Sequence, residues 1–162
     1  KPVALLDTHL HIDHIFGNNF MLDEYGLSAR AHEADSFWVE DAEKYAAMLG
    51  MRGITPPPAL GEYLKDGDVV KFGHSELKVI HVPGHSPGGL CFYAEKDKLL
   101  IAGDVLFQGS IGRADLPGGD MHQLLKGIRE KLFVLPDDVR VIPGHGGFTT
   151  IGEEKRMNPF FQ

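Results

Sequence analysis

The stretch Thr8-His9-Leu10-His11-Ile12-Asp13-His14 places four potential metal ligands within six residues of chain. In an extended backbone, alternate side chains point to the same side, so His9, His11 and Asp13 are expected to converge just after a short apolar strand. His14 follows where a helix is expected to begin, and the positive end of a helix keeps a histidine ring neutral and able to bind metal. The stretch therefore predicts a metal site at the end of the first strand.

Three more candidate ligands lie far downstream, each directly after a predicted strand and beside a glycine. Loops at strand ends present functional groups on a rigid sheet, and glycine lets the backbone approach a ligand closely. The three segments are Pro83-Gly84-His85-Ser86-Pro87-Gly88, Ala102-Gly103-Asp104 and Pro143-Gly144-His145-Gly146.

Five histidines and two aspartates suit two divalent ions, with three nitrogen or oxygen ligands for each and one carboxylate bridging both. The positive charge of two divalent ions exceeds the negative charge of two aspartates. The site therefore stays electropositive in a chain of formal net charge −7. Divalent metals lower the pKa of bound water to about 7, which provides a hydroxide that can attack a carbonyl. An anionic substrate is therefore favoured.

The bulk composition is that of one globular domain spanning 1–162, with 43% hydrophobic and 24% charged residues. No apolar run approaches the roughly 18 residues of a membrane span. The acidic net charge, without a Lys/Arg cluster, argues against nucleic acid as a partner and leaves a small substrate. Cys91 is the only cysteine and the first residues lack a signal-peptide pattern, so we expect a cytoplasmic protein.

Apolar periodicity predicts helices and strands that form a layered α/β sandwich. The turn signal Asp66-Gly67 opens a half rich in strands, and Asp120 is the expected N-cap of a later amphipathic helix. We expect strands at 3–6, 27–31, 69–72, 77–82, 90–93, 99–102 and 139–142, and helices at 15–25, 33–49, 121–132 and 149–157.

The run Thr8 to His14, with His85, Asp104 and His145 downstream in order, resembles the metallo-β-lactamase superfamily. The segments Asp66-Gly67-Asp68, Pro83 to Gly88, Gly103-Asp104-Val105-Leu106-Phe107 and Gly112-Arg113-Ala114-Asp115 are similar to its glyoxalase II-like branch. The resemblance implies a single αββα sandwich with two divalent metals, of which zinc is expected first and iron or manganese are alternatives. It implies that His9, His11 and His85 bind one metal, that Asp13, His14 and His145 bind the other, and that Asp104 bridges them.

Two departures from the family pattern concern the ends of the chain. Only one strand precedes the histidine-rich run, whereas family members have a β-hairpin and further strands there, so we expect an N-terminally truncated sandwich. The sheet edge left in that case makes a homo-oligomer plausible. Glyoxalase II enzymes that bind glutathione also carry a helical C-terminal domain, whereas this sequence ends soon after His145, so the resemblance does not identify the thiol of the substrate.

The expected reaction is hydrolysis of a thioester, such as a hydroxyacyl-thiol, or of a related ester by a metal-bound hydroxide. Asp13 and Asp104 are the expected catalytic carboxylates. Arg113 aligns with a basic residue that contacts anionic substrate groups in glyoxalases, but Asp115 replaces the tyrosine that usually follows. β-Lactamase activity is not expected, because the subclasses with a cysteine ligand need cysteine where Asp104 stands, and many have arginine where His14 stands.

Other activities and roles compete with this interpretation. The resemblance extends to persulfide dioxygenases, which bind one iron through the positions of His9, His85 and Asp104. A catalytically inactive fragment is a third hypothesis. A lone histidine is usually structural, so His32, His74, His81 and His122 are not expected to be ligands. Asp7 is a candidate acceptor for the second nitrogen of a ligand histidine, whereas Cys91 and Trp38 are expected in the core.

Overall fold

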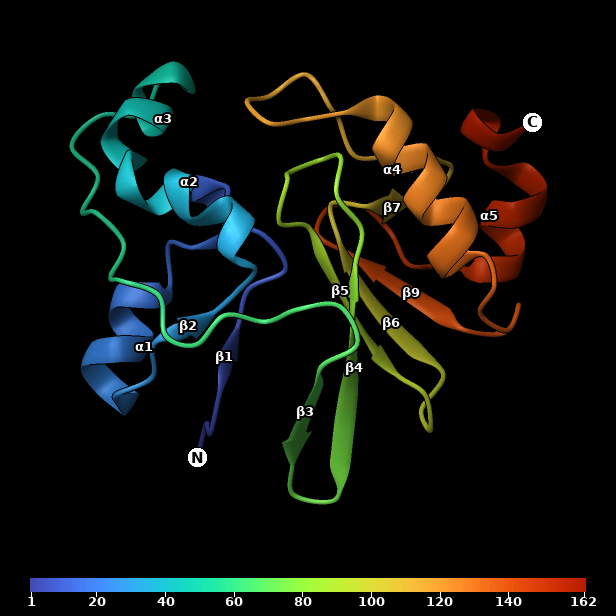
Figure 1. Ribbon diagram of the computed structural model, residues 1–162, viewed down its shortest axis with the longest axis horizontal. Helices are drawn as coiled ribbons and strands as arrows, with labels where there is room; N and C mark the ends of the chain where they lie inside the picture. The colour runs from blue at the N-terminus through green and yellow to red at the C-terminus, as the bar shows by residue number, and fades with distance from the viewer.

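The computed structural model describes residues 1–162, and its centre is a six-stranded mixed sheet (Figure 1). Neighbouring strands run antiparallel, except β6 and β9, which are parallel. Because β5 reverses the direction between β4 and β6, the strands β4, β6 and β9 all point the same way, and their carboxyl ends meet at one edge. The sheet order is β10 (Thr149–Thr150), β9 (Arg140–Pro143), β6 (Leu99–Gly103), β5 (Leu90–Ala94), β4 (Ser75–His81) and β3 (Val69–Phe72).

Two further strand pairs and the helices complete the expected αββα sandwich. The parallel pair of β1 (Leu5–Leu6) and β2 (Ala29–Arg30) lies on one side of the large sheet, with α1 (Asn18–Tyr25), α2 (Ser36–Glu40) and α3 (Ala42–Met48) beyond it. On the other side lie α4 (Met121–Gly127) and α5 (Ile151–Met157), seen at the right of Figure 1. β7 (Leu106–Phe107) and β8 (Ser110–Ile111) form a small hairpin. Short turns of helix occur at Ile12–His14, Glu33–Asp35 and Pro159–Phe161, and a π-helical turn, Ile128–Leu132, extends α4.

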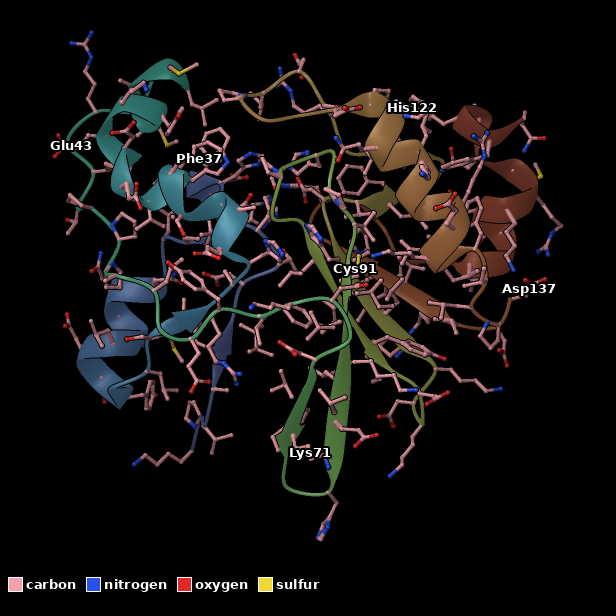
Figure 2. The ribbon with its side chains drawn as sticks, in the orientation of Figure 1. Phe37, Glu43, Lys71, Cys91, His122 and Asp137 are labelled. Carbon is pink, nitrogen blue, oxygen red and sulfur yellow. The ribbon has the colours of Figure 1, made fainter.

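The central strand β5 is buried along its whole length because both faces of the sheet are covered. Leu90 and Phe92 belong to a core cluster on one face, against which Leu6 of β1 packs. Cys91 and Tyr93 belong to the larger cluster on the other face, together with residues of α4. Figure 2 shows Cys91 in the interior, as the sequence predicted. Alternate side chains of one strand thus fill two cores, as the pleat of a strand requires.

A third core cluster supports the segment that carries the first four candidate ligands. It contains Leu10 and Ile12 of that segment and the aromatic residues Trp38 of α2 and Tyr45 of α3. The rings of Trp38 and Tyr45 have their centroids 4.3 Å apart. The expected core position of Trp38 is confirmed.

Several element boundaries differ from the sequence-based expectation. The helix expected at 33–49 is interrupted at Asp41, whose backbone (φ −109°, ψ 30°) leaves the helical region between α2 and α3. The helix expected from residue 15 begins at Asn18, and Thr149–Thr150 adds strand β10 before α5 rather than starting a helix. The expected cap of α4 is confirmed, since Asp120 accepts a hydrogen bond from the Gln123 amide at 2.9 Å. No helix combines the length and apolar character needed to cross a membrane.

Candidate metal centre

The seven side chains predicted as metal ligands come together at the sheet edge where β4, β6 and β9 end. They follow four strands: His9, His11, Asp13 and His14 come after β1, His85 after β4, Asp104 after β6 and His145 after β9. The shared direction of β4, β6 and β9 explains why residues so far apart in the chain meet here. The structure groups these side chains in three overlapping sets that could hold a metal ion: His9, His11 and His85; Asp13, His14 and His145; and His9, His14 and Asp104, which connects the other two.

The first set consists of His9, His11 and His85, all buried, whose ligand atoms lie within 4.8 Å of one another. The Nε2 atom of each ring is buried and has no hydrogen-bond partner. Buried polar atoms are nearly always paired, so three unpaired nitrogens at one place need a ligand of another kind. A divalent ion bound by imidazole nitrogens meets that need.

Burial also puts these rings in the protonation state that binds metal. It lowers the pKa of His11 from 6.5 to about 4, and it lowers the pKa values of His9 and His85 in the same direction. A charged imidazolium loses its hydration in such a setting, so the neutral form is favoured. The three rings are therefore neutral near pH 7 and can each offer a lone pair.

Hydrogen bonds on the opposite nitrogens orient two of these rings. His85 Nδ1 donates to the backbone carbonyl of Arg113 at 2.7 Å, which assigns the proton to Nδ1 and leaves Nε2 free for a metal. Thr8 Oγ1 lies 3.1 Å from His9 Nδ1 and can hold that ring in the same way. The segment that carries Arg113 thus takes part in building the site through its backbone.

The second set consists of Asp13, His14 and His145 and is more exposed than the first. The Nε2 atoms of His14 and His145 lie 3.2 Å apart, and they lie 3.5 Å and 3.4 Å, respectively, from Asp13 Oδ2. Asp13 lies in the 3₁₀ turn Ile12–His14, not in an extended strand. The alternation argument therefore applies to His9 and His11 only, and the turn directs Asp13 toward His145.

Asp104 lies between the two sets. Its Oδ1 is 3.6 Å from His14 Nε2, and its Oδ2 is 3.6 Å from His85 Nε2 and 3.4 Å from His145 Nε2. Burial acts to raise the pKa of Asp104, but the neighbouring histidines outweigh it and hold the pKa below its ordinary value. An ionised carboxylate within 3.6 Å of histidines of both sets is placed to bridge two cations.

Glycines beside the candidate ligands allow this close packing. A Cβ at Gly144 would lie 2.2 Å from Asp104 Oδ1, and one at Gly112 would lie 1.9 Å from the Asp104 carbonyl oxygen. Neither contact is sterically allowed for a carbon atom. Both positions therefore require glycine so that the backbone can reach Asp104.

Five of the seven candidate ligands line a cleft of about 610 Å³: His11, Asp13, His85, Asp104 and His145. Besides ligands, the cleft is lined by Leu49, Phe107, Ser110, Ile111, Arg113 and Leu116. Arg113 is the only Lys or Arg side chain among the lining residues, but its guanidinium donates to both carboxylate oxygens of Asp115, at 2.6 Å and 2.7 Å. This ion pair lowers the pKa of Asp115 to about 2. The predicted anion-binding side chain thus lies at the cleft, already paired with a carboxylate.

The four histidines not expected to be ligands lie outside the three sets. His74 and His122 are exposed, and Figure 2 shows His122 on α4. His32 and His81 stack on each other with ring centroids 4.0 Å apart.

Asp7 does not have the contact that the sequence suggested. Its carboxylate accepts a hydrogen bond from Asn18 Nδ2 at 2.8 Å, not from a histidine ring nitrogen. Burial raises its pKa to about 6. This hydrogen bond joins the segment that follows β1 to the start of α1.

Sequence reasoning missed Asp35, a carboxylate with no exposed surface. It accepts hydrogen bonds from the Leu10 amide, the Ser86 hydroxyl and the Gly88 amide. Burial raises its pKa, although these three hydrogen bonds act in the opposite direction. Its position among apolar residues of a predicted amphipathic helix was the available signal, because a charged side chain is rarely placed there without a partner.

Residues 1–145 match the family model of the metallo-β-lactamase superfamily. The chain belongs to this superfamily. The fold and the His/Asp clusters agree with a metal-dependent hydrolase that uses divalent ions.

Individual relatives in the superfamily cover nearly the whole chain. Hydroxyacylglutathione hydrolase GloC of Haemophilus influenzae is 39% identical over 158 residues, which are 97% of this chain and 74% of that protein. The crystal structure of TTHA1623 in a di-iron-bound form is similar with a TM-score of 0.90 at 39% identity, over 99% of this chain and 78% of that one. The crystal structure of the BLEG-1 B3 metallo-β-lactamase has a TM-score of 0.92 at 40% identity, over 99% of this chain and 77% of that one.

Proposed function

We propose that the protein is a binuclear metal-dependent hydrolase of the glyoxalase II type, which cleaves a thioester of a hydroxy acid or a related ester. The main support is the presence of two complete ligand sets side by side, with Asp104 between them. The proposed ligands are His9, His11 and His85 for one ion, Asp13, His14 and His145 for the other, and Asp104 for both. Zinc is the ion proposed first, although the related TTHA1623 structure holds two irons.

The proposed reaction assigns separate tasks to residues of the cleft. Bound divalent ions supply activated water and polarise a carbonyl oxygen. Asp13 lines the cleft and is placed to accept a hydrogen bond from the attacking water and so to orient it. Arg113, which lines the cleft, is the proposed contact for an anionic group of the substrate. The thiolate leaves without an obligatory general acid, because thiols have pKa values near 8.5.

The shape of the cleft supports a small substrate with an apolar portion. Its volume of about 610 Å³ lies within the usual range for small-molecule sites. Leu49, Phe107, Ile111 and Leu116 offer apolar contacts beside the candidate ligands. The single buried cysteine fits the proposed cytoplasmic location, because it has no partner for a disulfide.

Metal content and turnover test the proposal together. Elemental analysis of the purified protein should give about two ions per chain. S-lactoylglutathione and a panel of other hydroxyacyl thioesters should be hydrolysed without oxygen consumption. Failure of the fully metallated protein to turn over any of these thioesters would refute thioester hydrolysis. Asp104→Ala should abolish activity and lower the metal content.

A persulfide dioxygenase is the second candidate, favoured by the distance of 3.6 Å between His85 Nε2 and Asp104 Oδ2 beside the buried His9. Two histidines and one carboxylate form the face that mononuclear iron oxygenases use. One iron per chain and oxygen uptake with a thiol persulfide would establish this reaction instead. The similarity to the BLEG-1 B3 metallo-β-lactamase adds a β-lactam assay to the panel, because the sequence argument against that activity stays a prediction.

A further inference from the structure

Asp35 joins two segments that lie far apart in the sequence. It is the last residue of the 3₁₀ turn Glu33–Asp35 and immediately precedes α2, and it has no solvent-exposed surface. Its Oδ2 accepts from the Leu10 amide at 3.2 Å and from Ser86 Oγ at 2.9 Å. Its Oδ1 accepts from the Gly88 amide at 2.5 Å. All three donors therefore come from outside the 3₁₀ turn that contains Asp35 and from outside α2.

These donors are next to the ligands of the three-histidine set. Leu10 lies between His9 and His11, and Ser86 is adjacent to His85. One carboxylate thus binds the backbone of the first ligand segment and the loop that carries the third ligand. The ring of His85 is oriented separately, by the Arg113 carbonyl. Asp35 sets the position of the backbone segments, whereas the Arg113 carbonyl sets the direction of a ring.

The packing around Asp35 leaves little room for adjustment. A Cβ at Gly88 would lie 2.6 Å from Asp35 Cγ and 2.8 Å from its Oδ1, so only glycine fits at this position. A buried carboxylate is costly unless its oxygens are hydrogen-bonded, and three donors from two segments provide those bonds. A movement of either segment would break these hydrogen bonds and leave the buried carboxylate unpaired, which is unfavourable. The two segments are therefore held in place.

We propose that Asp35 is a positioning residue that holds segments 9–11 and 85–88 at the separation needed by the three-histidine set. It raises the affinity for the ion bound there without touching that ion. This inference rests on the proposed metal centre but not on the proposed thioester substrate. Outer hydrogen-bond partners of metal sites typically change metal affinity by 10- to 100-fold, which is the size of effect we expect.

The test is a competition titration of metal-free protein with Zn²⁺ and a chromophoric chelator, which gives two stepwise dissociation constants. Asp35→Asn keeps the size of the side chain but turns an amide donor toward one of its three donors. We expect the dissociation constant of one ion to rise about 10- to 100-fold and that of the other to change by less than about threefold. An unchanged pair of constants would overturn the inference.

Glu154→Gln is a matched control for the loss of a buried carboxylate. Glu154 is also buried and accepts from the Gly109 amide, Thr149 Oγ1 and Asn158 Nδ2, none of which belongs to segments 9–11 or 85–88. This variant should lower the melting temperature and leave both zinc constants unchanged. If it weakened zinc binding as much as Asp35→Asn does, general destabilisation would explain both results and the inference would be wrong.

Ser86→Ala keeps the test decisive if Asp35→Asn does not fold. It removes one of the three donors and leaves the two backbone amides in place, so a smaller rise of about two- to fivefold in the same zinc constant is expected. No change in that constant would count against Asp35. If the wild-type protein binds no zinc, the proposed metal centre fails; if it binds zinc but hydrolyses no thioester, only the proposed reaction fails.

Discussion

Replacing Gly112 by alanine should disable the metal centre, although Gly112 carries no functional group. A Cβ at this position would lie 1.9 Å from the Asp104 carbonyl oxygen and 3.0 Å from His85 Nδ1. Non-bonded carbon contacts have their optimum near 3.5–4.0 Å, so the two segments must separate by more than about 1 Å. Two of the proposed ligands would therefore move.

The consequence for activity follows from that displacement. The next residue, Arg113, provides the carbonyl that accepts from His85 Nδ1, so a shift of this segment also disturbs the orientation of His85. A misplacement of about 1 Å in a catalytic arrangement can lower the rate by about 100-fold. We therefore expect kcat/KM to fall by about 100-fold. Overpacking should also cost about 1–3 kcal/mol of folding stability.

The assay compares thioester hydrolysis, metal content and thermal unfolding of Gly112→Ala and wild type in excess zinc. Gly17→Ala is the control, because a Cβ at Gly17 meets no atom within 4 Å and its φ of −81° suits alanine. This control should keep kcat/KM within about twofold. A Gly112→Ala protein that retained two ions and a kcat/KM within about threefold of wild type would refute the role assigned to this close contact.

Three other predictions concern charge, protonation and packing. Asp115→Asn removes the negative charge that is paired with the Arg113 guanidinium. KM for an anionic thioester should therefore fall by about two- to fivefold, while KM for an uncharged thioester stays the same. Unchanged KM values for both thioesters would show that Arg113 does not contact the substrate. Burial lowers the pKa of His11 from 6.5 to about 4, so the unfolded chain binds this proton more readily. The free energy of unfolding of the metal-free wild type, measured by denaturant titration, should therefore fall as the pH falls from 6.5 toward 4. It should fall more steeply than that of His11→Asn, and an equal pH dependence of the two proteins would contradict this prediction. Leu132 is fully buried. Leu132→Ala should therefore lower the free energy of unfolding, measured in urea, by about 2–5 kcal/mol. A loss below about 1 kcal/mol would contradict this prediction and would mean that neighbouring side chains fill the cavity.

The parts of the fold predicted from the sequence are those with a local pattern. The apolar run at 90–93 became the buried strand β5, and Asp120 caps α4 as expected. The hairpin of β7 and β8 was not predicted, because strands of two residues have no periodicity. The interruption at Asp41 was also missed, since the apolar stripe continues across it and the change of direction depends on packing against other segments.

The sequence by itself determined the superfamily, the αββα sandwich and the set of seven candidate ligands, because residue types, glycines and strand ends recur in a specific order. Only the tertiary structure decided which side chains are neighbours. It placed Asp13 beside His145 and buried Asp35 between two ligand segments. The physical reason is that these contacts depend on the common direction of β4, β6 and β9 and on close packing at glycines, and neither is a property of a local stretch of chain.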